Sequence, residues 1–172
     1  MVRTALLTLT TVMLLHTAAA AETEPGLITG TFTKGPAIGG TERFITPNVL
    51  LIVRERGLGH IAGGVLTGAA AYRFKEEILD FAAQIGTFDL TVTITKDNGS
   101  SITLGLVGFT TGVTPTATTV TVNGTWVVLS ASGHDADLHG EGQFTGSENF
   151  LTGETEGTFV GLIHAAREEQ RR

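Results

Sequence analysis

The sequence predicts an all-β protein: a single closed antiparallel β-barrel of about eight strands, with a short helix at most. Three observations carry this prediction. Thr and Gly dominate the chain, with 29 Thr and 23 Gly in 172 residues, and this composition favours strands and tight turns over helices. Residues 88–95 alternate strictly, so the apolar side chains from Phe88 to Ile94 share one face of a half-buried strand. Asn98-Gly99 follows directly, and Asn-Gly is the strongest short-range signal of a β-hairpin.

The other strands follow from the same alternation and from the turns between them. The segment 60–74 is consistent with one long bent strand or with two, its glycines being bulges or corners. Asn123-Gly124 stands inside a strand pattern and predicts a bulge rather than a second hairpin turn. Only residues 75–84 have a helical spacing, which leaves a short helix and a turn equally open. The expected strands are 27–33, 49–56, 60–74, 88–95, 102–106, 118–129, 138–144 and 155–164.

A meander of this length exposes two sheet edges unless it closes on itself or folds into two packed sheets. Glycines on the strand faces favour the barrel, since tight curvature needs positions without a side chain. An eight-stranded barrel is just wide enough to be filled by its own side chains or to hold one small ligand.

The first stretch of the chain has the layout of a secretory signal peptide. Arg3 gives a positive start, an apolar run follows, and a run of four alanines ends at Ala21. The apolar run is shorter than the roughly 20 residues that a membrane-spanning helix needs. We therefore expect export with cleavage after Ala20 or Ala21, and secretion without cysteine is more typical of a bacterial protein than of an animal one. The expected divisions are a signal peptide over 1–21, a barrel domain over 22–164 and a charged tail over 165–172.

The composition excludes several classes of function. The chain has 17 acidic and 11 basic residues and a formal charge of −6, whereas a nucleic-acid-binding domain needs a basic stripe. The absence of Cys excludes disulfide scaffolds, thiol catalysis, thiolate zinc sites and iron–sulfur clusters. Gly140-Glu141-Gly142 is not a phosphate loop, because it lies inside a strand pattern with no helix after it. We expect no cofactor, no nucleic-acid partner and no membrane span, and the sequence leaves the oligomeric state open.

Two neighbouring segments resemble a known family. Residues 124–133 have the sequence GTWVVLSASG, and residues 138–144 have the sequence LHGEGQF. They are similar to a TW-x-V, SGTG, L-x-G-x-G-x-F series in bacterial DUF3224-type domains and, more loosely, in allene oxide cyclase-like barrels. The resemblance implies a barrel, and through the cyclase group it implies a cofactor-free cyclase or isomerase. Residues 134–137 depart from the family, which has a small turn after Ser-Gly.

A first candidate site lies where the second expected strand ends. Strict alternation places Arg54 and Arg56 on the same face as the apolar residues before them. If this face lines the lumen, two guanidinium groups and nearby His60 stand at a barrel mouth, where planar forks suit a carboxylate ligand. The alternative is that the strand has left the core by this point and that the charges are solvated.

A second candidate site is an apolar pocket. Tyr72, Phe88 and Trp126 are the aromatic residues that we expect to line the lumen. The alternative is plain core packing, because small cores use their aromatic side chains as fillers.

A third cluster has the residue types of a metal site. On a strand, Asp135, Asp137 and His139 would share one face, next to His134, and would offer oxygen and nitrogen ligands to zinc or calcium. The alternative is an exposed polar loop. One local cluster without a remote ligand is a weak signal, so we expect no metal here.

The sequence is consistent with three functions. The favoured one is a binding module that holds a small apolar or amphipathic molecule in its lumen, because no catalytic motif is present. The others are a cofactor-independent cyclase or isomerase, which can act by shaping its substrate, and a solid barrel that acts as a surface or interaction protein. The volume of the lumen separates them. A cavity of roughly 300 Å³ or more with one inward titratable group favours the enzyme, and a dry apolar cavity favours the binding module. A filled core with no cavity above a few water volumes excludes both and leaves the interaction protein.

Overall fold

The computed structural model describes residues 26–165, and this part of the chain is almost entirely β-strand. Its helical elements are two single-turn 3-10 helices, η1 (Gly64–Leu66) and η2 (Gly133–Asp135). The strands are β1 (Gly26–Lys34), β2 (Thr41–Thr46), β3 (Val49–Val53), β4 (Arg56–Ala62), β5 (Gly68–Asp80), β6 (Ile85–Thr95), β7 (Ser101–Thr111), β8 (Thr119–Ser132), β9 (Leu138–Asn149) and β10 (Glu154–Ala165).

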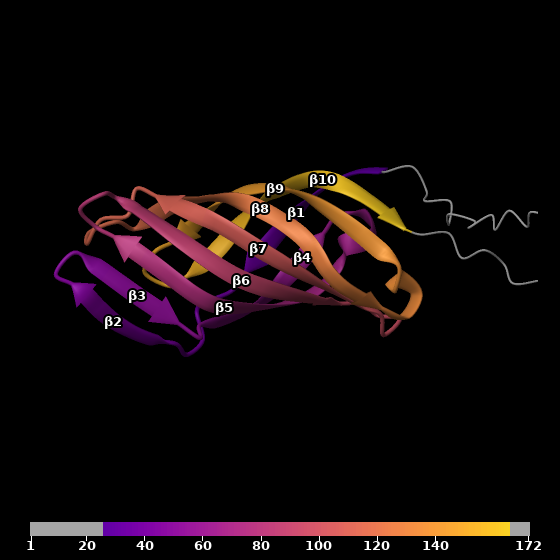
Figure 1. The fold of residues 1–172 in the computed structure, drawn as a ribbon, viewed down its shortest axis with the longest axis horizontal. Coiled ribbons are helices and arrows are strands. Elements are labelled where there is room, and N and C mark those ends of the chain that lie inside the picture. Colours follow the sequence, from indigo (N-terminus) through magenta and orange to yellow (C-terminus); the bar gives the residue numbers. More distant parts are fainter. Residues whose placement is uncertain (1–25, 166–172) are drawn as a thin grey trace, which may run out of the picture.

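Eight of these strands close into an antiparallel barrel (Figure 1). Around the barrel they follow the order β5-β4-β1-β10-β9-β8-β7-β6, and pairing of β6 with β5 completes the ring. β1 lies between β10 and β4, so the first and last described strands are neighbours. Closure pairs the strand edges that an open meander would expose. The predicted fold class is therefore confirmed.

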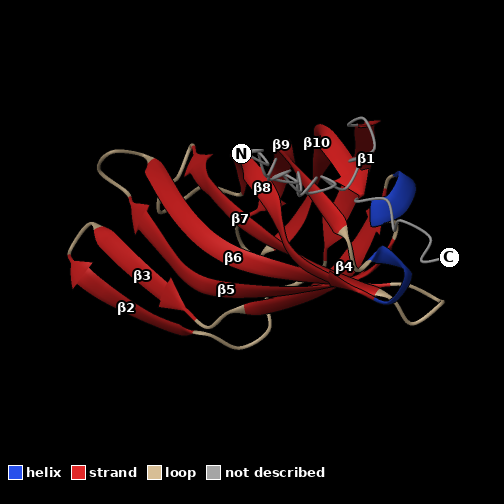
Figure 2. Ribbon diagram, turned by 45° about the vertical axis from the view of Figure 1, so that its right-hand side comes forward, coloured by secondary structure: helices blue, strands red, loops and turns tan. Residues whose placement is uncertain are grey.

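β2 and β3 form a hairpin outside the barrel, which extends the sheet at one end (Figures 1 and 2). β5 is long enough to serve two neighbours, since residues 68–73 pair with β4 and residues 76–80 pair with β3. Between β3 and β4 the chain turns at Arg54, whose φ of 62° lies outside the extended region. The predicted strand 49–56 is therefore wrong in its second half, and β2 was not predicted at all.

The segment with helical spacing is not a helix. Lys75 to Asp80 form the second half of β5, where β3 and β6 pair with it on either side. Two ladders of backbone hydrogen bonds outweigh a local helical preference. A turn follows, in which the Asp80 carboxylate accepts hydrogen bonds from the backbone N–H groups of Ala82 and Ala83.

Two further predictions about strand geometry are resolved. The segment 60–74 is two strands, β4 and β5, separated by η1. Asn123-Gly124 is neither a bulge nor a turn, since both residues pair in regular register with β7 and β9. The irregularity of β8 lies instead at Leu129. This extra residue stands between the pairs Thr103–Ser130 and Leu104–Val128 and has no partner of its own in the register with β7.

A large apolar core lies inside the barrel, and a smaller one includes Ile52 of the β2–β3 hairpin. The large core surrounds Val92, Ile94 and Ile102, which have no exposed surface, and Leu66 of η1 is buried against it. Figure 2 shows the two helical turns at the end of the barrel opposite the β2–β3 hairpin. The smaller core consists of Ile52, Leu79, Val113 and Val120.

The predicted divisions of the chain are only partly within the described residues. The signal peptide over 1–21 and residues 166–172 of the predicted tail lie outside them. Ala165, the first residue of the predicted tail, is the last residue of β10.

Candidate functional site

A group of charged and polar side chains lies inside the barrel, between the two apolar cores. β5 runs from the large core to the small one, and Glu77 is buried between them. The other strands contribute residues near their ends, at the same end of the barrel. We call this group the polar layer; it consists of Lys34 (β1), Glu55 (β3–β4 connection), Glu77 (β5), Glu148 (β9) and Thr155 (β10).

Lys34 is the cation of the polar layer. Its Nζ lies 3.4 Å from Glu55 Oε1, and the two side chains are only 3% and 12% exposed. The same Nζ lies 5.2 Å from the centroid of the Phe74 ring, within reach of a cation–π interaction. Glu55 reaches the layer because the turn at Arg54 interrupts the alternation of β3. A buried ion pair of this kind holds both partners in place.

Glu77 is the least satisfied member of the layer. Its side chain is buried, and the carboxyl group makes no hydrogen bond or ion pair with any residue between 26 and 165. Burial raises its pKa to about 8, the negative charges of Glu148 and Glu55 act in the same direction, and Lys34 opposes them. At neutral pH the Glu77 carboxyl is therefore mostly protonated.

Glu148 is held more firmly than Glu77. Its Oε2 accepts a hydrogen bond of 3.1 Å from the Thr155 hydroxyl. Burial raises the pKa of Glu148, although Lys34 and the Thr155 hydroxyl act to lower it. The layer thus places three carboxyl groups around one ammonium, which is already engaged with Glu55.

A cavity extends from the polar layer into the large core. Its volume is about 60 Å³, and its wall is mainly aromatic and aliphatic. This volume is room for a few water molecules, well below the roughly 300–1,000 Å³ of pockets for drug-sized ligands. The residues that line the cavity include Phe32, Lys34, Leu66, Tyr72, Phe74, Glu77, Phe88, Trp126, Phe144, Glu148, Thr155 and Phe159.

Two lining residues carry polar atoms within the apolar wall. The Tyr72 hydroxyl donates a hydrogen bond of 3.1 Å to the backbone carbonyl of Thr33, and burial raises the pKa of this phenol above its usual range. The Trp126 indole N–H is buried and has no partner among the described residues. Its ring packs edge-on against Phe159, with a centroid distance of 6.2 Å. A buried N–H without an acceptor costs stability, so this indole is an energetic liability of the core.

The structure separates the residues predicted from sequence into two groups. Tyr72, Phe88 and Trp126 are buried and line the cavity. Arg54 and Arg56 are exposed and do not follow Ile52 into the interior, which agrees with the alternative interpretation that these charges are solvated. The reason is the positive φ of Arg54, which turns Glu55 inward instead. His60 is also exposed, on the outer side of β4.

Sequence reasoning missed the polar layer. Glu77 stands in a segment whose spacing is helical, which predicts a short helix or a turn there and not a buried strand. Lys34 and Glu148 lie at or near the ends of β1 and β9. The apolar alternation that predicts these strands stops at Phe32 and Phe144. Even spacing was the available signal, because Lys34 is two residues after Phe32 and Glu148 is four after Phe144.

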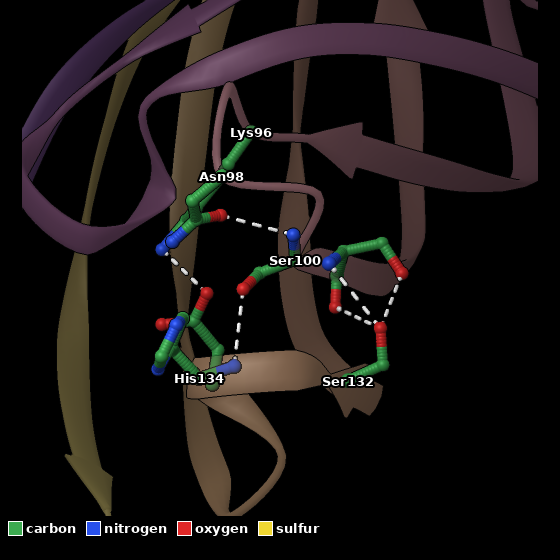
Figure 3. A network of polar contacts seen from close by, with 7 residues as sticks. Lys96, Asn98, Ser100, Ser132 and His134 are labelled. Carbon is green, nitrogen blue, oxygen red and sulfur yellow. Dashed lines mark hydrogen bonds and ion pairs between the residues drawn. The ribbon is translucent and has the colours of Figure 1, made fainter.

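The candidate metal cluster is divided among different partners (Figure 3). Lys96 Nζ lies 2.7 Å from Asp135 Oδ2, and this ion pair ties the β6–β7 turn to η2. Ser100 Oγ accepts a hydrogen bond from the backbone N–H of His134 at 3.1 Å. His139 instead stacks on His164, its cross-strand neighbour, with ring centroids 5.6 Å apart. Within residues 26–165 no three His, Asp or Glu side chains are grouped so that they could hold a metal ion.

The outer surface of the barrel carries exposed apolar side chains in addition to its many threonines. They lie on β7, β8, β10 and β1, with β9 between β8 and β10, and they border a shallow hollow. The exposed residues around it are Leu27, Val107, Val127, Leu129, Val160 and Leu162.

Comparison with known proteins adds no relative to these observations. No protein-family model matches the chain, and no curated protein matches it. In the described part of the chain, no helix is both long enough and apolar enough to cross a membrane.

Proposed function

We propose that the protein is an exported β-barrel that binds a small apolar or amphipathic molecule in its lumen. The observation that carries the proposal is the cavity itself, which joins an aromatic wall to a polar layer whose carboxyl groups are not fully paired. A buried polar group without a partner costs free energy. A ligand that brings an apolar body and one polar group would satisfy both parts of this site.

The size of the cavity limits the ligand. About 60 Å³ admits a molecule of a few heavy atoms, or the narrow end of a longer one. A larger ligand would have to displace aromatic side chains from a packed wall, at the cost that overpacking a core carries.

The single tryptophan of the chain offers a direct test of lumen binding. Trp126 lines the cavity, so its fluorescence reports on occupancy without competing signals. We expect small apolar or amphipathic compounds to change this fluorescence in a saturable way. Native mass spectrometry of the protein from its own host should reveal a co-purifying small molecule. A bare protein whose fluorescence no small compound changes would contradict the proposal.

A second candidate function is a cofactor-independent cyclase or isomerase. The observation that favours it is the Glu77 carboxyl, whose pKa of about 8 suits a group that both gives and takes a proton near neutral pH. The resemblance to allene oxide cyclase-like barrels supports the same candidate. An enzyme would release a rearranged compound, whereas a binder returns the ligand unchanged. Mass spectrometry and NMR of compounds recovered after incubation, with wild type and Glu77→Gln, distinguish the two.

A third candidate is an interaction protein with a solid barrel. The small cavity and the exposed apolar side chains on β7, β8, β10 and β1 favour it. Light scattering across a concentration series tests whether these side chains mediate self-association. A strictly monomeric protein with an occupied lumen would favour the binding module instead.

Export is part of the proposal and has its own test. The alanine junction of residues 18–21 supports cleavage after Ala20 or Ala21. N-terminal sequencing of secreted material should therefore begin at Ala21 or Glu22. Secreted protein that begins at Met1 would contradict this part of the proposal.

A further inference from the structure

The polar layer has an excess of carboxyl groups over cations. Lys34 is the cation among Glu55, Glu77 and Glu148, and it is within ion-pair distance of Glu55 only. The Thr155 hydroxyl donates a hydrogen bond to the Glu148 carboxylate. Glu77 thus remains a buried carboxyl that lines the cavity and has no hydrogen-bond partner among the described residues.

We propose that this site selects a small amine, whose ammonium group lies between Glu77 and Glu148 and whose carbon atoms lie against the aromatic wall. The inference rests on the proposed lumen-binding function and names its ligand class. An alkylammonium has three N–H donors on a compact positive charge, and it would supply the cation that the layer lacks. One aromatic ring of this wall, that of Phe74, already lies 5.2 Å from the cation Lys34 Nζ.

Other ligand chemistries fit the layer less well. A carboxylate ligand would add a fourth acidic group to a layer whose one ammonium is already bound to Glu55. A metal ion needs several ligands at short distance, and within residues 26–165 no group of three acidic or His side chains can provide them. A neutral alcohol could exchange a hydrogen bond with the Glu77 carboxyl but would bring no cation to the layer.

Trp126 is a second residue of the cavity wall with a buried polar group that has no partner among the described residues. Its N–H is buried in the same wall and has no acceptor among the described residues. With about 60 Å³ available, the amine that fits the cavity as it stands has two or three carbon atoms.

Binding of an amine should depend on pH in a characteristic way. The groups that face Glu77 are Lys34, Glu55 and Glu148, and the Tyr72 hydroxyl lines the same cavity. Because Glu77 must lose its proton to pair with an ammonium, affinity should rise about tenfold per pH unit below its pKa of about 8. The binding reaction should release about one proton per ligand between pH 6 and 7.5.

A matched set of compounds and variants tests the inference. Trp126 fluorescence and calorimetry at pH 8 and constant ionic strength would compare ethylamine and propylamine with propanol and propionate. The variants are Glu77→Gln, Glu148→Gln and the control Glu76→Gln, which makes the same substitution at an exposed neighbour. We expect wild type and Glu76→Gln to bind propylamine at least tenfold more tightly than propanol or propionate. Both other variants should lose that preference while their circular dichroism stays unchanged.

The outcomes separate the inference from the proposed function. Equal binding of propanol and propylamine, unaffected by Glu77→Gln, would overturn the amine selection and leave lumen binding standing. Preferred binding of propionate would overturn the charge argument. If none of these compounds changes the Trp126 fluorescence or gives a heat of binding, both lumen binding of small molecules and amine selection fail.

Discussion

At the scale of single residues, the interior of the barrel contains polar groups that are buried without hydrogen-bond partners. Glu77 is a carboxyl group in an apolar wall, and Trp126 has an N–H without an acceptor. Each costs stability, because water would have satisfied both groups in the unfolded chain. Residues of this kind are the first place to look for function.

Glu77 should make the stability of the protein depend on pH. Its pKa is about 8 in the folded state and near 4.5 in the unfolded chain. Between these values the folded protein holds a proton that the unfolded chain has lost, so the free energy of unfolding falls as the pH rises from 5 to 8. Glu148 acts in the same direction.

We expect Glu77→Gln to remove much of this decline and to be the more stable protein above pH 8, by a few kcal/mol as an order of magnitude. Urea unfolding at pH 5, 6, 7, 8 and 9 measures it, with Glu76→Gln as the control. Parallel profiles for wild type and Glu77→Gln would show that Glu77 is not held protonated by the fold.

Trp126 should be a main contributor to stability. It is 4% exposed and packs against Phe159 in the large core. Trp126→Ala removes a large buried ring and should lower the free energy of unfolding by about 3–5 kcal/mol. The neighbouring Val127→Ala, on the exposed side of β8, should change it far less. Thermal or denaturant unfolding measures both, and equal effects would mean that the indole is not a core side chain.

At the scale of elements, the strands curve because glycines on one strand lie beneath aromatic rings of the next. Gly124 on β8 faces Phe144 on β9, its cross-strand partner. Gly108 on β7 faces Phe88 in the same way. Aromatic rings that cover strand glycines are a known device of curved sheets. The Asn-Gly pair at 123–124, which suggested a bulge, is such a position and not a break in the strand.

Gly124→Ala should therefore destabilise the barrel. A Cβ there would collide with the backbone carbonyl of Val107 and would lie 2.6 Å from Phe144 Cζ. Overpacking of this kind typically costs about 1–3 kcal/mol. Gly26→Ala is the matched control, because the nearest atom to its Cβ would be 3.7 Å away. Chemical denaturation compares the two variants, and equal stability would argue that Phe144 moves aside freely.

At the scale of the whole molecule, the barrel and the β2–β3 hairpin differ in how firmly they are held. β6 and β7 are central strands with fully buried residues, whereas all six residues of β2 are exposed and β2 pairs only with β3. An edge strand with few buried contacts opens locally at low free-energy cost.

Hydrogen exchange should therefore proceed in two classes. We expect amides of β2 to exchange by local opening, and those at Val92, Ile94 and Ile102 only by unfolding of the barrel. Mass spectrometry or NMR of the exchanging protein measures this. Equal protection of the hairpin and of β6 would mean that the hairpin is an integral part of the barrel's cooperative unit.

The sequence by itself determined the fold class and much of the large core. Alternation along 88–95 and 102–106, with Asn-Gly between them, was enough to place Leu90, Val92 and Ile94 inside, because both signals are local. The aromatic lining residues Tyr72, Phe88 and Trp126 were also within reach of this reasoning.

Only the tertiary structure decided where the charges lie. The backbone of Arg54 turns Glu55 inward and leaves both neighbouring arginines exposed, and no local pattern indicates that conformation. Residues 75–80 became a strand because β3 and β6 pair with them from either side, which buries Glu77. The polar layer is assembled from Lys34, Glu55, Glu77 and Glu148, which are far apart in the sequence. Their proximity is a consequence of barrel closure, and closure is a property of the pairing of all eight strands and not of any one segment.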